Sequence, residues 1–211
     1  MEGHTKRLID ETLYAHIHFE GVPVLEGKEQ SPEIIAIDAI SDQTPLMRLR
    51  GITDFTPTFS GITWTTTPEI KADLGLVVKK IYGWADNSLS LSGTYPGVKQ
   101  ISLVCRKETL DRESFYNSYK AHTKIARKHH GMQNYAQNIE LKHLYGSHPD
   151  NLEIDGISEL WFSSRKDLEK QFYLHSNSAE IVRKDTETFI DFRKTKSIMV
   201  SETRFRSNTN G

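Results

Sequence analysis

The stretch KQISLVCRKETLDRESFYNSYKAHTKIARKHHG, residues 99–131, decides the fold that the sequence predicts. Apolar side chains alternate with other residues from Ile101 to Cys105, as in a strand with one buried face. A helix is expected over residues 112–130, because either Thr109 or Asp111 can cap its start and a glycine follows its end. The stretch therefore reads as a strand followed by a long helix.

The rest of the C-terminal half continues this pattern. The sequence predicts a strand over residues 132–145, a strand over 157–163, helical segments over 165–174 and 178–191, and a strand over 196–204. The resulting β-α-β-β-α-β order is the ferredoxin-like pattern, an α+β fold with an antiparallel sheet. Residues 205–211 are expected to form a flexible tail.

Residues 1–95 give a weaker pattern, which we interpret as a degenerate second half of the same kind. Strands are expected over residues 13–19, 32–40, 59–66 and 87–92, and a helix over 68–82. Gly61-Ile62 and Trp64 resemble Gly156-Ile157 and Trp161, although the second segment has two more residues before its tryptophan. Two related modules would explain this likeness, and chance similarity is the alternative.

Composition excludes several classes of protein. The 211 residues include 27 basic and 28 acidic ones, so bulk positive charge for nucleic-acid binding is absent. The longest apolar runs are too short to cross a bilayer, and the first residues lack the form of a secretory signal. The single cysteine points to a reducing compartment. We therefore expect a cytoplasmic protein without nucleic-acid or membrane partners.

The predicted helix over residues 112–130 presents one stripe of possible functional side chains. Spacings of four, three, four and three residues place on one face Phe115, Tyr119, His122, Ala126 and His129. A histidine facing a partly apolar cavity can accept and return a proton near neutral pH. The alternative is a histidine at the edge of the core, bonded to a backbone carbonyl.

Three further residues are candidates for the same site. Asp185 would lie on the apolar face of its helix and need a partner: a histidine, an amide at the end of the sheet, or an arginine such as Arg183 or Arg193. Tyr135 begins a strand from which its hydroxyl could bond a substrate oxygen, or it is a core aromatic. Trp161 and Phe162 alternate across a strand, so one of them could line a cavity.

A pair of histidines, His16 and His18, shares one face of a predicted strand. This spacing occurs among metal ligands, but the further ligands of such a motif are missing here. The sequence predicts no metal site.

Several ordered segments of the C-terminal half resemble the EthD family over residues 99–204. The resemblance comes from Phe115, Tyr119 and His122, the run DGISELWF at residues 155–162, and the closing Asp185, Phe189, Asp191 and Val200-Ser201-Glu202. It implies a dimeric α+β barrel, in which two ferredoxin-like sheets pack face to face. Such a barrel could be a homodimer or be built from both halves of one chain.

The resemblance also implies a function. We expect a cofactor-independent lyase of the cyclase or dehydratase type, acting on a hydrophobic, oxygenated aromatic or polyketide-like small molecule. His122 would move the proton, Tyr135 would stabilise the oxyanion, and Asp185 or Tyr119 would orient the histidine. Substrate-binding residues would be Phe115, Tyr119, His129 and Trp161. The alternatives are a monooxygenase, either cofactor-free or haem-dependent, and a non-catalytic carrier of a hydrophobic metabolite.

Overall fold

The computed structural model describes residues 11–21, 34–68, 70 and 72–205, and its centre is a closed antiparallel barrel. Among these residues eight strands form the barrel: β1 (Glu11–His18), β2 (Ile34–Ile40), β3 (Gly61–Thr65), β4 (Leu74–Trp84), β6 (Val98–Val104), β7 (Asn134–Gly146), β8 (Gly156–Phe162) and β9 (Lys196–Arg204). The short β5 (Gly93–Thr94) adds to β9 outside this ring. The predicted α+β class with antiparallel strands is confirmed.

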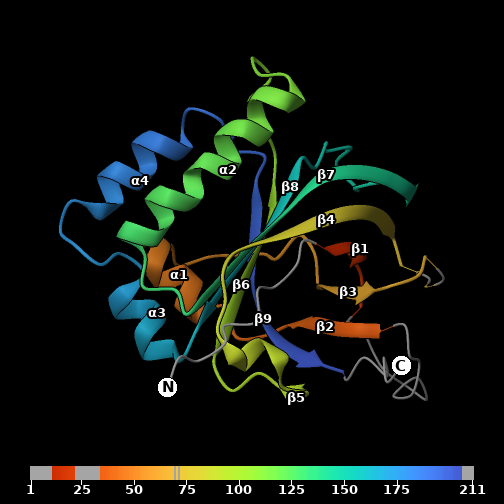
Figure 1. The fold of residues 1–211 in the computed structure, drawn as a ribbon, viewed down its shortest axis with the longest axis horizontal. Coiled ribbons are helices and arrows are strands. Elements are labelled where there is room, and N and C mark those ends of the chain that lie inside the picture. Colours follow the sequence, from red (N-terminus) through yellow and green to blue (C-terminus); the bar gives the residue numbers. More distant parts are fainter. Residues whose placement is uncertain (1–10, 22–33, 69, 71, 206–211) are drawn as a thin grey trace, which may run out of the picture.

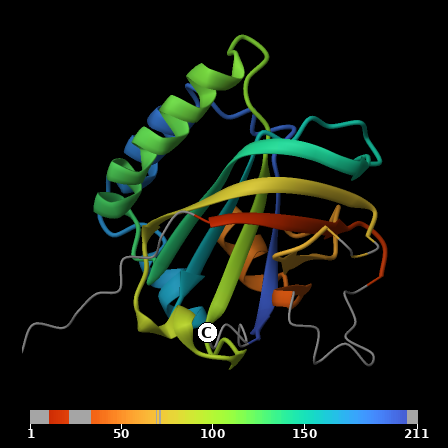
Figure 2. The same ribbon diagram turned by 45° about the vertical axis from the view of Figure 1, so that its right-hand side comes forward.

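The two halves of the chain contribute four barrel strands each. Their spatial orders are β2-β3-β1-β4 and β7-β8-β6-β9. In both halves, the strand that comes second along the chain lies at one edge, followed in space by the third, the first and the fourth strand of that half. Pairing of β4 with β7 and of β2 with β9 joins the halves at both seams. Figure 2 shows β4 and β7 as long, curved neighbours.

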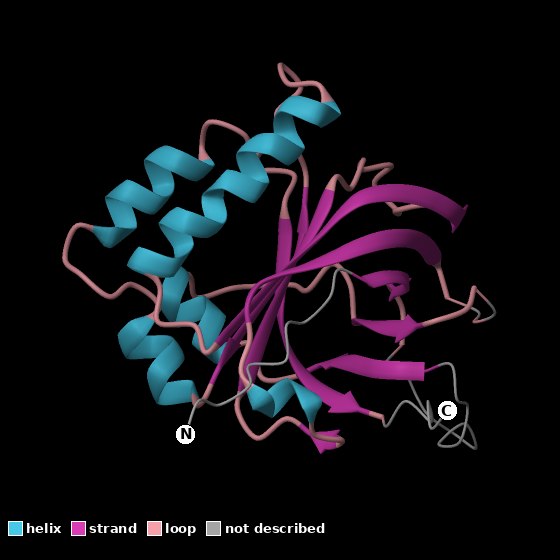
Figure 3. Cartoon of the chain, viewed as in Figure 1, coloured by secondary structure: helices cyan, strands magenta, loops and turns pink. Residues whose placement is uncertain are grey.

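Four helices gather on one side of the barrel (Figures 1 and 3). They are α1 (Thr44–Arg50), α2 (Arg112–His129), α3 (Arg165–Gln171) and α4 (Ser178–Thr186). Helix α2 lies beside α4, and α1 lies beside α3 and β9. Although α1 belongs to the N-terminal half, it therefore covers the sheet of the C-terminal half. None of the helices in the described part of the chain is long and apolar enough to cross a membrane.

The start of α2 follows from local chemistry. The Asp111 carboxylate accepts a hydrogen bond from the backbone N–H of Ser114, at 2.7 Å, and so caps the helix. Of the two caps that the sequence allowed, the structure uses Asp111. The buried face of α2 contains Phe115, Tyr119, His122 and Ala126, as the stripe predicted.

Strand alternation sorts side chains between the barrel interior and the helix layer. In β6, Ile101 and Leu103 pack into the large core inside the barrel. Their neighbours Gln100, Ser102 and Val104 face the helices and line a cavity there. The sheet β7-β8-β6-β9 therefore has two different buried faces.

The prediction of a helix over residues 68–82 is wrong, because β4 occupies Leu74–Trp84. Leu74, Leu76 and Val78 alternate into the barrel core with low exposure. Pairing with β1 on one side and β7 on the other outweighs the helical spacing that the segment also permits.

The strand predicted over residues 87–92 is also wrong. Asn87–Ser90 form a 3₁₀-helix, and the Asp86 carboxylate accepts a hydrogen bond from the Ser88 backbone N–H. Two predictions fall largely or wholly outside the described residues: the tail over 205–211 and the character of the first residues of the chain.

Candidate active site

A cavity of about 470 Å³ lies between the helices and the outer face of the sheet β7-β8-β6-β9. Its walls are mixed in character. Apolar walls come from side chains that include Val104, Met132, Leu160, Phe172, Val182 and Ile190, while polar side chains include Gln100, Ser102, Tyr119, His122, His130 and Tyr135. A mainly apolar cavity with a few convergent polar groups is typical of a small-molecule site.

His122 and Asp185 form a bonded pair at this cavity. The His122 Nδ1 and the Asp185 Oδ2 are 2.6 Å apart, joining α2 to α4. Because the carboxylate is an acceptor, Nδ1 carries the proton and Nε2 is left as an unprotonated base. Burial lowers the pKa of His122, although Asp185 raises it, so the imidazole is neutral near pH 7.

The position of Asp185 differs in one respect from the sequence prediction. The buried face of α4 contains Ser178, Val182 and Thr186, and the Asp185 side chain is 33 % exposed. The carboxylate therefore reaches His122 from the edge of the helix rather than from its apolar face. Of the partners that the sequence left open, a histidine is the one found.

Tyr135 lines the cavity from β7 with its phenol held in place. The Gln137 Nε2 donates to the Tyr135 hydroxyl oxygen at 2.9 Å and to the Tyr119 carbonyl at 2.6 Å. The phenol also has a side-chain hydrogen bond with Tyr119, so both Gln137 and Tyr119 hold its position. Burial raises the pKa of Tyr135 above its usual range, which keeps the proton on the phenol. Sequence reasoning did not identify Gln137 as a positioning residue.

Tyr119 also lines the cavity, one turn before His122. Its hydroxyl lies 2.7 Å from the Ser158 Oγ on β8, and burial raises its pKa. This contact fixes α2 against the sheet. Tyr119 is therefore a wall of the cavity, as the sequence predicted for this side chain.

His130 lines the cavity, although it lies outside the stripe that the sequence predicted on the helix. It is 7 % exposed, and its Nδ1 donates to the Phe172 carbonyl at 2.5 Å. Burial lowers its pKa to about 4, so its Nε2 is a second unprotonated acceptor at the cavity. The helix ends just before this residue, and the extended backbone of His130 lets its side chain line the cavity.

Three predicted substrate-binding residues lie away from the cavity walls. Phe115 packs with Tyr119 and Phe189 in the core beneath α2. His129 bonds the Ser178 hydroxyl, at 3.0 Å. Trp161 faces the barrel interior, where its indole N–H donates to Glu202 at 2.8 Å, on the opposite face of the sheet from His122. Of the predicted residues, the structure brings together His122, Asp185, Tyr135 and Tyr119.

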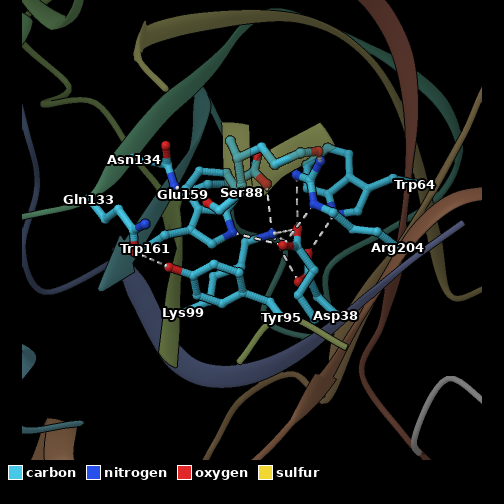
Figure 4. A network of polar contacts seen from close by, with 12 residues as sticks. Asp38, Trp64, Ser88, Tyr95, Lys99, Gln133, Asn134, Glu159, Trp161 and Arg204 are labelled. Atoms are coloured by element: carbon cyan, nitrogen blue, oxygen red, sulfur yellow. Dashed lines mark hydrogen bonds and ion pairs between the residues drawn. The ribbon is translucent and has the colours of Figure 1, made fainter. Parts of the chain in front are cut away.

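The barrel interior holds a second polar group, which sequence reasoning missed (Figure 4). The Lys99 ammonium is fully buried and lies 2.8 Å from a carboxylate oxygen of each of Asp38, Glu159 and Glu202. Two further cations complete the set: Lys80 pairs with Glu159 at 2.7 Å, and Arg204 pairs with Glu202 at 3.0 Å. We call these six residues the interior charge cluster.

The pKa of Asp38 in this cluster shifts in the opposite direction from the pKa of the two glutamates. Burial, reinforced by the other two carboxylates, raises the pKa of Asp38 to about 6 despite Lys99. For Glu159 and Glu202 the nearby cations outweigh burial and lower the pKa to about 2. The three carboxylates likewise outweigh burial at Lys99 and raise its pKa.

Asp38, Glu159 and Glu202 have oxygens close enough together to hold a metal ion. The Lys99 ammonium occupies the position between them and supplies the positive charge instead. The donor set therefore does not fit a metal while Lys99 is present. His16 and His18 also have other partners: the His16 nitrogens bond Tyr145 and Thr65, and His18 Nε2 lies 3.0 Å from the Thr63 hydroxyl.

Comparison with known proteins adds a family assignment for part of the chain. A search of curated proteins finds no match. The family model of the EthD domain matches residues 107–193, a segment that contains α2, β7, β8, α3 and α4. Strands β6 and β9, which complete the sheet under the cavity, lie outside the matched segment. The match covers less than half of the chain, and it falls within the part of the sequence that resembles the EthD family.

Proposed function

We propose that the cavity is the active site of a cofactor-independent lyase of the dehydratase or cyclase type. The observation that carries the proposal is that His122 and Tyr135 line the same cavity while the His122 Nδ1 lies 2.6 Å from the Asp185 carboxylate. The substrate would be a hydrophobic, oxygenated small molecule, in keeping with the mainly apolar walls.

In a dehydration, His122 Nε2 would take a proton from the carbon next to a substrate carbonyl. The electron pair would move onto the carbonyl oxygen, where the Tyr135 hydroxyl donates a hydrogen bond to the developing charge. The charge of Asp185 would stabilise the imidazolium formed at His122. When the enolate re-forms its carbonyl, the β-hydroxyl would leave, accept the proton from His122 and depart as water.

We further propose that the barrel is the single-chain equivalent of a dimeric α+β barrel. The equal strand orders of the two halves, and their joining at two seams, support this. On this proposal residues 1–95 form a degenerate ferredoxin-like half, and residues 99–204 form the half that keeps the site. A second copy of the chain would not be needed to cover the sheet.

A β-hydroxy ketone tests the reaction. Loss of water from 3-hydroxy-1-tetralone gives 1-naphthol after tautomerisation, which is followed by fluorescence. We expect the wild-type protein to accelerate this loss, and His122→Gln to slow it by about 10²- to 10⁴-fold, the usual contribution of a positioned base. Asp185→Asn should slow it as well, because the imidazole loses its fixed tautomer.

His143→Gln is the matched control, since this histidine is exposed and bonds the Gly146 carbonyl instead. If His122→Gln converts the ketone as fast as the wild-type protein does, His122 is not the base. Binding of the ketone without conversion by the wild-type protein would favour the carrier instead.

A further inference from the structure

Arg50, the last residue of α1, differs from the other arginines in the described part of the chain. Eight of them pair with a carboxylate or lie over an aromatic ring: Arg48, Arg106, Arg112, Arg127, Arg165, Arg183, Arg193 and Arg204. Arg50 makes no such contact with a described residue, although it lines the cavity together with Leu49. Arg50 is exposed to solvent and borders the proposed active site, with no charged or aromatic partner among the described residues.

The described side chains that line the cavity do not balance this charge, and the nearby Asp185 carboxylate is already bonded to His122. Among the described residues that line the cavity, none is an aspartate or a glutamate, and His122 and His130 are neutral near pH 7. Surrounding protein removes part of the water from Arg50 and lowers its pKa, yet an arginine remains protonated under these conditions. An unpaired, partly desolvated guanidinium next to apolar walls favours an anionic ligand group.

A second group in the wall also lacks a partner. Gln100 is 6 % exposed and lines the cavity, and its Oε1 has no hydrogen-bond partner among the described residues. Its amide nitrogen donates to the Ser102 hydroxyl at 3.3 Å. A buried amide oxygen left unpaired is costly, so a polar ligand that donates to it would stabilise this wall.

We propose that the cavity binds a carboxylic acid, whose carboxylate pairs with Arg50 and whose aromatic or otherwise apolar body lies against Met132, Leu160 and Phe172. This inference rests on the proposed function and narrows its substrate class to organic acids. The planar guanidinium offers two parallel N–H donors, which suit a carboxylate better than a neutral carbonyl. Arg50 is then a binding residue supplied by the N-terminal half to a site in the C-terminal half.

A pair of fluorescent probes that differ in charge tests the proposal. Binding of 6-hydroxy-2-naphthoic acid and of 6-hydroxy-2-naphthamide is titrated by fluorescence with the whole protein. We expect the acid to bind the wild-type protein about 10- to 100-fold more tightly, as for one charge-assisted hydrogen-bonded pair. Arg50→Gln should abolish this difference and leave the affinity for the amide nearly unchanged.

Arg48→Gln is the control, because Arg48 lies on the same helix but pairs with Glu169 outside the cavity. Equal affinity of wild-type protein for acid and amide, no detectable binding of the acid, or an unchanged preference in Arg50→Gln would each overturn the proposal. Binding is measured without turnover, so the two proposals fail separately. If the wild-type protein dehydrates the ketone but shows no preference for the acid, or if the preference persists in Arg50→Gln, only the role of Arg50 is refuted. An Arg50-dependent preference without dehydration refutes only the lyase.

Discussion

Replacing Lys99 by methionine would remove the cation at the centre of the interior charge cluster and leave a side chain of similar length. Glu159 would keep Lys80 at 2.7 Å, and Glu202 would keep Arg204 at 3.0 Å. Asp38 would keep the Trp64 indole N–H at 2.6 Å but would lose its ammonium partner in the described structure. Asp38 therefore becomes the uncompensated buried charge.

The expected loss is about 3–5 kcal/mol in the free energy of unfolding at pH 8, the usual cost of breaking a buried ion pair from one side. Burial already raises the pKa of Asp38 to about 6, above its unfolded value of 3.8, and losing Lys99 raises it further. A carboxyl with a raised folded pKa opposes folding increasingly as the pH rises. The loss caused by Lys99→Met should therefore be smaller at pH 5 than at pH 8.

Urea unfolding followed by tryptophan fluorescence measures this effect, since Trp64 and Trp161 both contact the cluster. With a slope of about 2 kcal/mol per molar, the midpoint should fall by roughly 2 M at pH 8. Adding Asp38→Asn to the variant should recover part of the loss. Lys124→Met, an exposed lysine on α2, is the control. Equal midpoints for Lys99→Met and Lys124→Met would refute the reasoning.

Two further predictions concern stability. The cations hold the pKa of Glu159 and Glu202 at about 2 in the folded protein, whereas the pKa of an unfolded glutamate is 4.5. The stability that these two glutamates contribute above pH 4.5 should therefore disappear as the pH falls from about 4.5 toward 2. Circular dichroism would show this loss as acid unfolding. A pH-independent unfolding energy across that window would contradict this. Gly146→Ala should lower stability by more than about 2 kcal/mol, because φ is +71° and a Cβ would lie 1.8 Å from the Asp73 carbonyl oxygen. Gly21→Ala has the same φ of +71° but open space, so a comparable loss there would show that the clash is not the cause.

Local patterns in the sequence predicted those parts of the site that lie within single elements. The stripe on α2 placed Tyr119 and His122 on the buried face correctly, because helical spacing and a capping aspartate determine it. The same kind of pattern misassigned residues 74–84, where alternation and helical spacing were both satisfied. There, pairing with β1 and β7 decides the structure, and a single sequence does not contain that information.

Contacts between distant segments were harder to predict. Asp185 needed a partner, but the choice of His122 depends on how α2 and α4 pack. Lys99, Glu159 and Glu202 each share a strand face with apolar residues, which was a signal in the sequence. Their burial follows only from barrel closure, which turns those faces inward. Arg50 was missed because α1 crosses to the other half of the chain.

Closure of the barrel within one chain removes a constraint that acts on symmetric assemblies. In a homodimer every substitution appears twice, so both copies of a pocket change together. Here the β4–β7 and β2–β9 seams join halves with different sequences, and each half can change alone. One half can thus carry most of a pocket while the other half contributes a helix to its wall. Separate expression of residues 107–193 would omit α1, β6 and β9 and thereby remove walls of that pocket.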